Sequence, residues 1–481
     1  MFLIFPHQLF YDLSHLTLGE KIYLIEEPRF FTDFKFHKLK LAYHRASMKI
    51  YYDYLIDNNF NVKYITFDKV NDNFYTKLTN IKCIELNDHK LTKKLINPIL
   101  IPNKNFLVDS DELSEIKRLI YKNSRYHHDA FYKYQRKKLD ILINTDDTPI
   151  GNKWTFDTEN RLPLPKTYIK QPIPKLNTRS TKSYIKEAIA YIDADFESNY
   201  GDLSVDNFIY PIDNKGAIKW LKIFLKKRLI NFGKYEDAIH TDDNFIYHSV
   251  ISPMMNIGIL TDREVIKHTL AYYKKNHQQI PLGSIEAFIR QIIGWRNYVY
   301  VLYMLEGKNM YESNQLNHTN RLPYRRLWEG TTGIEPVDDA IKNIIKYSYT
   351  HHIQRLMVLG SYLLLLEIEP KEVYRIFMEW TIDAYDWVMV PNIFGMSQFA
   401  TPIMMNRPYF SSYNYLLKMS NYNNAEWCNI WKALYYSFIS KHKKILSKNY
   451  AFASQVKNWD KKTPSEKKEL LRIGNNYKIN L

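Results

Sequence analysis

The segment MFLIFPHQLFYDLSHLTLGEKIYLI, residues 1–25, holds two short apolar runs, Phe2–Phe5 and Ile22–Ile25, with polar and turn-forming residues between them. A helix-length stretch, residues 34–57, follows the second run. Short buried strands that alternate with helices are typical of a parallel sheet, so this pattern predicts an α/β domain. Three further runs extend the pattern, at residues Val62–Phe67, Lys82–Leu86 and Phe106–Val108. We expect this domain to occupy residues 1–125.

The remainder of the chain shows the periodicity of helices. From about residue 185, apolar residues recur at helical spacing, as in Ala217, Trp220, Leu221 and Phe224, with lysines between them. Several prolines between residues 149 and 174 interrupt regular structure, as an ordered connector requires. At 481 residues the chain also exceeds the roughly 250 to 300 residues that one hydrophobic core supports. We therefore expect a connector over residues 126–185 and a helical domain over residues 186–481.

The chain is strongly basic, with 67 Lys and Arg against 51 Asp and Glu and a formal net charge of +16. Such an excess attracts polyanions over long distances, so a nucleic acid is the favoured partner. The alternative is compositional drift in a chain rich in Lys, Asn, Ile and Tyr.

Cysteine content and hydropathy exclude several classes of protein. Cys83 and Cys428 are the two cysteines, so neither a disulfide framework nor a cysteine-built zinc or iron–sulfur site can form. The longest apolar run, Leu356–Leu366, is well short of the roughly 20 residues that a bilayer requires. The first residues read as a buried strand and not as a signal peptide. We expect a soluble, intracellular, monomeric protein without a membrane segment.

Polar residues follow the first two predicted strands. Ligands of open α/β sheets bind beyond the carboxyl ends of the strands, which here groups His7 with Glu26 and Glu27. No G-x-G-x-x-G or Walker A sequence follows either strand, so an ordinary dinucleotide or triphosphate site is not indicated. The alternative is that these are ordinary loop residues.

Family resemblance rests on motifs that recur in order over almost the whole chain. They are FKFHKLKLAYHRASMK, FYKYQRKKLDIL, GNKWTFDTENR, FGKYEDAI, YHSVISPMMNIGIL, FIRQIIGWRNY, YTHHIQRLM, IDAYDWVMVPN and GMSQFA. Together they resemble the prokaryotic branch of photolyases and cryptochromes that includes the (6-4) photolyases with an iron–sulfur cluster. The resemblance implies a Rossmann-like antenna domain followed by a larger helical domain that holds FAD.

The resemblance also implies which residues bind FAD. Hydroxyl and imidazole donors ahead of a helix suit a pyrophosphate, and a carboxylate–guanidinium pair suits the polar edge of the isoalloxazine. The implied phosphate-binding residues are Tyr235, His248, Ser249 and Ser252. The implied flavin wall runs from Gln291 to Arg296, and the isoalloxazine pair is Arg355 with Asp383.

Two adjacent histidines bear on catalysis. On a helix, His351 and His352 point about 100° apart, so a zinc site at the pair is not expected. His352 resembles the histidine that donates a proton to the lesion in (6-4) photolyases, and a group that titrates near neutrality suits that transfer. His351 is expected to support the pocket. The alternative for His352 is a buried histidine with a satisfied hydrogen bond.

Several positions depart from the family pattern. The cluster cysteines would fall near Pro336, Asn423, Glu426 and Cys428, so no iron–sulfur cluster is expected. An aromatic stripe would pack the last helices in its place, formed by Trp427, Trp431 and Tyr435.

The residues expected to carry electrons or a proton to the flavin also depart from the family pattern. Ile376 stands where the branch has an electron-carrying tryptophan, and Met389 stands where an acid often lies near flavin N5. Trp328 matches a more distant carrier, while Trp380 and Trp387 are either substitute carriers or core aromatics. Glu27 resembles the contact of a ribityl-lumazine antenna, but His7 replaces a common aspartate, so the antenna is that chromophore, another one or none.

These features favour a blue-light-driven (6-4) photolyase that acts on UV-damaged DNA. The first alternative is a cryptochrome photoreceptor without repair activity. A third hypothesis, a nucleic-acid-binding protein that has lost its flavin, is disfavoured because the phosphate-contacting segments persist.

Overall fold

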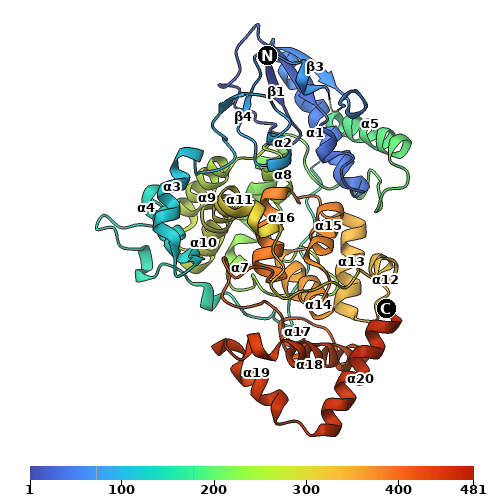
Figure 1. Cartoon of the computed structure of the whole chain (residues 1–481). Helices are drawn as coiled ribbons and strands as arrows, with labels where there is room; N and C mark the ends of the chain where they lie inside the picture. Colours follow the sequence, from blue (N-terminus) through green and yellow to red (C-terminus); the bar gives the residue numbers. More distant parts are fainter. Residues whose placement is uncertain (72, 177) are drawn as a thin grey trace.

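A computed structural model describes residues 1–71, 73–176 and 178–481, and it divides into an α/β region and a larger helical region (Figure 1). The α/β region contains a five-stranded parallel sheet with strand order β3-β2-β1-β4-β5. The expected combination of a parallel-sheet domain and a helical domain is therefore confirmed. The strands are β1 (Phe2–Ile4), β2 (Lys21–Ile25), β3 (Asn61–Ile65), β4 (Lys82–Ile84) and β5 (Ile99–Ile101).

The expected fifth strand at Phe106–Val108 is wrong. The fifth strand is β5, a short edge strand flanked by Pro98 and Pro102, whose side chains are largely exposed and therefore gave no burial pattern. Phe106–Val108 is a buried irregular segment instead. It docks on the helical region, where Phe106 stacks on Tyr300 with ring centroids 3.8 Å apart.

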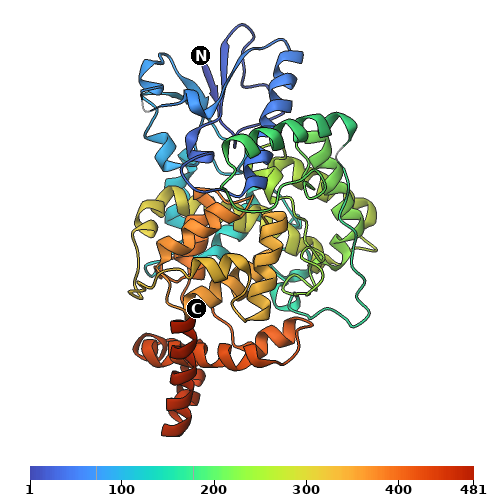
Figure 2. The same ribbon diagram turned by 90° about the vertical axis from the view of Figure 1, so that its right-hand side faces the viewer.

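Helix α1 is buried on nearly all sides over its first three turns, because it lies between the sheet, α5 and the helical region. Its N-terminus is capped by His37, whose Nδ1 accepts a hydrogen bond from the Leu39 backbone N–H. Figure 2 shows α5 running along α1, so the expected boundary between residues 185 and 186 falls inside a helix that packs on the α/β region. The helices up to this point are α1 (Lys38–Asp57), α2 (His89–Thr92), α3 (Leu113–Ile120), α4 (His128–Lys138) and α5 (Arg179–Asp195).

The rest of the described chain is helical apart from connecting loops. The apolar residues expected on one face of a helix, Ala217 to Phe224, are buried in α6. The helices are α6 (Asn214–Lys227), α7 (Leu229–Phe232), α8 (Ser252–Asn256), α9 (Asp262–Asn276), α10 (Leu282–Ile289), α11 (Asn297–Tyr311), α12 (Tyr324–Glu329), α13 (Glu335–Tyr347), α14 (Ser361–Leu365), α15 (Pro370–Trp380), α16 (Asp386–Val390), α17 (Tyr413–Met419), α18 (Glu426–Leu446), α19 (Tyr450–Asp460) and α20 (Pro464–Asn480).

Three π-helical segments interrupt this region: η7 (Arg290–Arg296), η8 (Gln354–Gly360) and η9 (Pro391–Ser397). π-Helical turns are rare and occur often at functional sites. Two of them carry residues implied in flavin binding, and the third directly follows α16.

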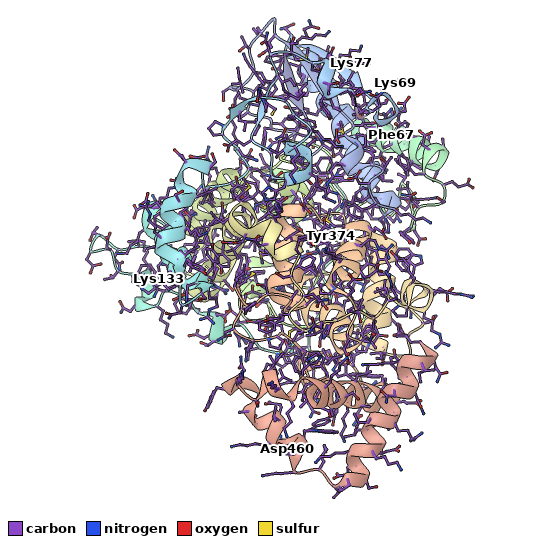
Figure 3. The ribbon with its side chains drawn as sticks, in the orientation of Figure 1. Phe67, Lys69, Lys77, Lys133, Tyr374 and Asp460 are labelled. Atoms are coloured by element: carbon purple, nitrogen blue, oxygen red, sulfur yellow. The ribbon has the colours of Figure 1, made fainter. Side chains whose placement is uncertain are left out.

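A buried ionic network joins the two regions. Arg29 of the α/β region contacts Asp88 at 2.9 Å and Asp386, the first residue of α16, at 3.4 Å. Tyr374, labelled in Figure 3, and Tyr303 donate their hydroxyl hydrogens to Asp386. The network fixes the start of α16 against the sheet, and Asp383 lies in the loop just before it.

The last helices, α18 to α20, form the lower end of the molecule in Figure 1, with α19 and α20 projecting from the body. Trp427, Trp431 and Tyr435 are all buried and pack α18 against neighbouring aromatics, as the stripe predicts. Among the helices described, none is both long and apolar enough to span a membrane.

Candidate functional site

The centre of the site is an ion pair between Arg355 and Asp383. Arg355, in η8, donates from Nη1 to Asp383 Oδ1 at 2.8 Å and from Nε to the Thr350 carbonyl oxygen at 2.6 Å. The Ser252 hydroxyl, at the start of α8, donates to Asp383 Oδ2 at 2.6 Å. Burial opposes the charge of Arg355, but the Asp383 carboxylate outweighs it and raises the pKa of the guanidinium. The structure thus brings together three residues that the motifs placed up to 131 positions apart.

Asn256 connects this pair to Arg296. The Asn256 side-chain amide donates to the Asp383 carbonyl oxygen at 2.7 Å, and its Oδ1 accepts from Arg296 Nη1. Arg296 also donates from Nε to Asp262 at 2.7 Å, and its guanidinium lies 4.8 Å from the Trp387 ring centroid. Sequence reasoning missed Asn256 and Asp262, although Asn256 lies within the YHSVISPMMNIGIL motif.

The histidines form a second group beside this pair. The His248 and His351 rings stack with centroids 4.5 Å apart and an interplanar angle of 16°. Burial and neighbouring positive charge lower the pKa of His351, and burial lowers that of His248 to about 3. Ser249 is held at the same place through its carbonyl oxygen, which accepts from the Trp220 indole at 2.8 Å.

His352 differs from its neighbours because its side chain is exposed. Surrounding protein and the nearby Arg355 cation nevertheless lower its pKa to about 4. The lowered pKa favours the neutral imidazole at pH 7, whereas a proton donor that titrates near neutrality was expected.

Tyr235 and Gln291 lie on another side of the site. Tyr235 stacks on Tyr247 with centroids 5.6 Å apart, and Gln291 donates from Nε2 to Glu236 at 2.5 Å. Burial raises the pKa of Glu236 to about 7 despite the neighbouring Arg290. Asn160 of the connector also donates to Glu236, at 3.2 Å, so connector and helical region meet here.

The donors present fit a flavin dinucleotide. Several buried nitrogen atoms have no hydrogen-bond partner among the described residues: Nε2 of His248, both ring nitrogens of His351 and Nη2 of Arg355. Unpaired buried donors are costly unless a ligand or water satisfies them. Together with the Tyr235 hydroxyl group, they supply the cationic and neutral donors that phosphate and flavin oxygens need, whereas the Ser252 hydroxyl hydrogen is already donated to Asp383.

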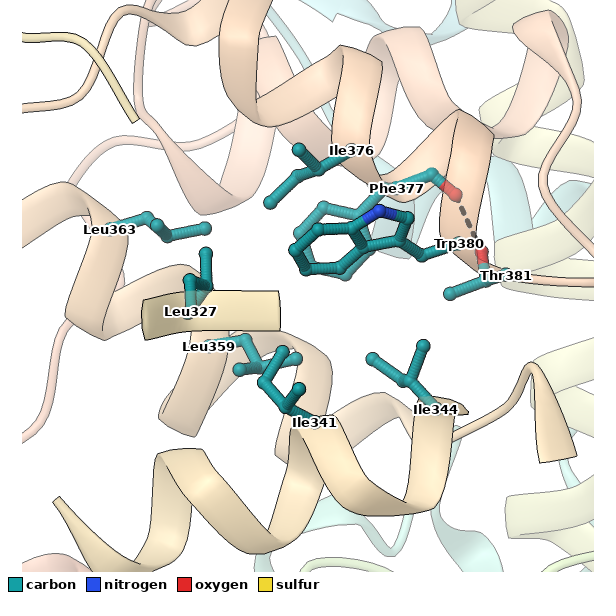
Figure 4. Close-up of a pocket in the computed structure, with 9 residues that line it drawn as sticks. All are labelled: Leu327, Ile341, Ile344, Leu359, Leu363, Ile376, Phe377, Trp380 and Thr381. Carbon is teal, nitrogen blue, oxygen red and sulfur yellow. Dashed lines mark hydrogen bonds between the residues drawn. The ribbon is translucent and has the colours of Figure 1, made fainter. Parts of the chain in front are cut away.

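Two of the three candidate electron-transfer tryptophans meet. The ring centroids of Trp328 and Trp380 are 4.9 Å apart, and Trp328 lies 4.7 Å from half-buried Tyr200. Trp380 also borders a small apolar cavity beside Ile376 and Phe377 (Figure 4). Trp387 instead packs against Phe106 and Arg296, and no ring contact joins it to the Trp328–Trp380 pair in the described chain.

The candidate antenna residues are buried at the sheet. Glu27 accepts hydrogen bonds from Tyr75 and from Lys94 Nζ, the latter at 2.6 Å. His7 is buried with both ring nitrogens unpaired in the described structure, and burial lowers its pKa to about 4. Glu27 thus already has partners within the protein, whereas the imidazole of His7 is available for a polar contact.

The positions that correspond to the family's cluster cysteines lie at the base of α13 and α18. Cys428 is buried, which raises the pKa of its thiol. Tyr422 donates to Asp339 at 3.1 Å, and the Trp427 indole donates to the Asn423 carbonyl oxygen at 3.2 Å. Within the described residues, no group of three or more His, Cys, Asp or Glu side chains is arranged to hold a metal ion.

Comparisons with known proteins identify relatives in sequence and in fold. Residues 2–208 match the family model described as deoxyribodipyrimidine photo-lyase-related protein. A (6-4) photolyase of Agrobacterium fabrum (strain C58) is 34% identical over 342 residues, which cover 68% of this chain and 65% of that protein, just under two thirds of its length.

Solved structures with the same fold include both classes of protein. A cryptochrome of Synechocystis sp. PCC6803 has a TM-score of 0.56 at 12% identity and covers 87% of this chain and 88% of its own. An archaeal photolyase of Sulfolobus tokodaii, solved with two FAD molecules, has a TM-score of 0.52 at 13% identity and covers 100% of both chains. The chain has the fold of the photolyase/cryptochrome superfamily and is similar in sequence to a (6-4) photolyase.

Proposed function

We propose that the protein binds FAD at the Arg355–Asp383 site and repairs pyrimidine (6-4) pyrimidone photoproducts in DNA under blue light. The observation that carries this proposal is the grouping of the Arg355–Asp383–Ser252 hydrogen bonds beside the stacked His248 and His351, with His352 exposed next to them. The likeness to a (6-4) photolyase over 342 residues supports it.

When bound at this site, reduced FAD would supply an electron to the lesion and would take it back once the bases are restored, so that repair involves no net oxidation or reduction. Arg355, Asp383 and Ser252 hold the flavin through donors and acceptors that already fix one another in register. The lesion is flipped out of the duplex toward His352, and unstacking costs less for a damaged base than for a paired one. His352 supplies a proton to it.

The low pKa of His352 sets a condition on that role. With a pKa of about 4, His352 carries little positive charge at pH 7 in the free protein. Phosphates or negative charge on the bound lesion would favour the imidazolium and raise this pKa. We therefore expect His352 to become a proton donor only in the complex with DNA.

The direct test is illumination of flavin-loaded, chemically reduced protein with oligonucleotides that carry a single (6-4) photoproduct or a cyclobutane dimer. Chromatographic recovery of intact thymines from the (6-4) substrate supports the proposal. Absence of recovery from either lesion, with full flavin occupancy and tight DNA binding, contradicts it.

A second candidate function is light sensing without repair. Ile376 and Met389 favour it, because both are buried apolar residues where the family pattern has an electron carrier and often an acid. The same illumination experiment distinguishes the two candidates, since a photoreceptor would change the flavin spectrum in light but leave both lesions intact.

A further inference from the structure

Positive charge is concentrated at the C-terminus of the chain. Residues 432–481 contain twelve Lys and Arg but three acidic residues, which gives a net charge of +9 out of +16 for all 481 residues. We call this segment the C-terminal arm; it consists of most of α18 with α19 and α20. One tenth of the chain thus carries more than half of its net charge.

The arm is an ordered structure. Tyr436 of α18 stacks on Trp459 of α19, with centroids 5.8 Å apart. Lys462 lies over the Tyr436 ring at 4.9 Å, and Lys467 lies over the Trp459 ring at 5.7 Å. These contacts join the three helices, so the lysines are held on one scaffold that projects from the body (Figure 2).

Many of the charges in the arm are not neutralised. Lys444, Lys457, Lys461 and Lys468 are exposed, and no ion pair links them to any residue that the structure describes. Tyr450, the first residue of α19 in the same arm, is 98% exposed. Exposed lysines with an aromatic ring among them are the composition that binds phosphate backbones and bases.

A connected path leads from the candidate site to the arm. Asp237, two residues after Tyr235, and Tyr409 both lie close enough to Arg161 of the connector to raise the pKa of its guanidinium. Arg407 lies 5.6 Å from the Tyr409 ring centroid, and the neighbouring Asn406 accepts a 2.6 Å hydrogen bond from Asn449 of the arm. The segment around Arg407 therefore lies between the site and the arm.

We propose that the C-terminal arm is a second phosphate-binding surface, which holds the backbone of duplex DNA outside the lesion. The inference rests on the proposed function because it takes DNA as the partner. A long, regular polyanion suits a charged scaffold that lies beyond the site. An anionic membrane is disfavoured, since a helix that binds a bilayer surface needs a continuous apolar face, and the exposed apolar side chains Ile445 and Ile479 lie on different helices.

The test compares two variants with the same net charge in the flavin-loaded full chain. The arm variant replaces Lys444, Lys457, Lys461 and Lys468 with Gln. The control variant replaces Lys63, Lys77, Lys93 and Lys122 with Gln; all four are exposed and lie in the α/β region or just after it. Figure 3 shows Lys77 at the opposite end of the molecule from Asp460, which lies in the arm.

Affinity for an undamaged 30-base-pair duplex is measured by fluorescence anisotropy at several salt concentrations. Each phosphate contact contributes about 0.9 to the slope of log K against log salt, so the arm variant should lose about 3 to 4 units of slope and bind about 10-fold or more weakly. The control variant should keep the wild-type slope. Equal thermal unfolding temperatures and flavin content establish that both variants are folded.

Wild-type affinity and slope in the arm variant would overturn the inference, as would equal losses in both variants. Binding of the wild type to phosphatidylserine vesicles, with unchanged DNA affinity in the arm variant, would also overturn it in favour of a membrane partner. Failure of the proposed function is a separate result: the wild type then repairs no lesion, while the arm variant still loses affinity for undamaged duplex.

Discussion

Lys40 of α1 donates a 2.7 Å hydrogen bond to the carbonyl oxygen of Ala384, the residue that follows Asp383. The same ammonium group donates to the Met378 carbonyl oxygen at 3.0 Å, in the last turn of α15. Lys40 is buried, and no carboxylate among the described residues forms an ion pair with it. Helix α1 of the α/β region thus holds the loop that presents Asp383 to the candidate flavin site.

Replacement of Lys40 by Met should weaken FAD binding. The variant leaves two carbonyl oxygens without their donor, at a cost of about 1 to 3 kcal/mol for each one that stays buried and unpaired. The loop before α16 becomes less fixed, so we expect about a 10-fold higher Kd for FAD in fluorescence titrations. Lys38→Met is the matched control, because Lys38 lies on the same helix but pairs with Asp193 on α5. Equal FAD affinity in the Lys40→Met and Lys38→Met variants would contradict the hypothesis that Lys40 positions the loop that carries Asp383.

Lys40 should also give folding stability a dependence on pH. Burial lowers its pKa from the ordinary 10.5 to about 7 in the folded protein. Between these values the unfolded chain binds more protons, so stability rises with pH from about 7 to about 10.5. This contribution is fully present above pH 10.5 and is lost as the pH falls through 7. Urea unfolding at pH 7 and pH 9.5 should show a larger gain for the wild type than for Lys40→Met, and equal gains would contradict the assignment.

Asp383→Asn should destabilise the protein and release its flavin. The substitution leaves Arg355 mostly buried without its anionic partner, and breaking such a pair costs about 3 to 5 kcal/mol. Chemical denaturation of the flavin-free protein measures this cost independently of catalysis. The matched control is Glu329→Gln, which removes the exposed ion pair with Arg325 and should cost no more than about 1 kcal/mol. A stable Asp383→Asn variant that retains FAD would show that the pair is unnecessary.

A strand or helix could be predicted from the sequence where one of its faces, or the whole element, is buried. The interior strands β1, β2 and β4 lie close to the predicted apolar runs, because interior parallel strands are apolar along their length. The edge strand β3 was also found, because its buried Val62 and Ile65 still give an apolar signal. β5 could not be found in this way, since an edge strand with exposed Ile99 and Leu100 has no burial pattern. The helical spacing predicted α6 but not the π-helical segments, which depend on tertiary packing and have no apolar period of their own.

The sequence indicated several residues of the candidate site but not the hydrogen bonds that join them. Arg355, Asp383 and Ser252 follow from motifs, whereas Asn256 and Lys40 act through backbone carbonyl groups that no spacing rule indicates. The low pKa of His352 could not be anticipated either, because it results from the protein that surrounds this side chain and from Arg355. The sequence named Trp380 and Trp387 as candidates of the same kind, but Trp387 lies in α16 against Arg296 and not beside Trp380.

Trp380→Phe and Trp328→Phe should both slow light-driven reduction of bound FAD. The two rings are in contact and lead toward half-buried Tyr200, whereas Trp387 belongs to a different aromatic group. Trp387→Phe is therefore the control and should keep the wild-type rate at equal flavin occupancy. The measurement is the loss of blue absorbance under constant illumination with an external thiol reductant. An effect confined to Trp387→Phe would place the electron route along α16 instead.

The choice between repair and sensing depends on His352. If His352 is the proton donor, His352→Ala should leave FAD bound and reducible but lower (6-4) repair by about 100-fold or more, because general acid catalysis is lost. Thermal stability should change little, since the side chain is exposed.

In the wild type, the His352 ring should titrate near pH 4 without DNA and at a higher pH with an undamaged duplex. NMR of labelled histidine measures this titration without any repair assay. The companion variant His351→Ala should instead reduce flavin occupancy and stability together, because His351 is fully buried and stacked on His248. Normal repair by fully loaded His352→Ala would exclude the proton-donor role, and an unchanged His352 titration on DNA would remove the condition under which it can act.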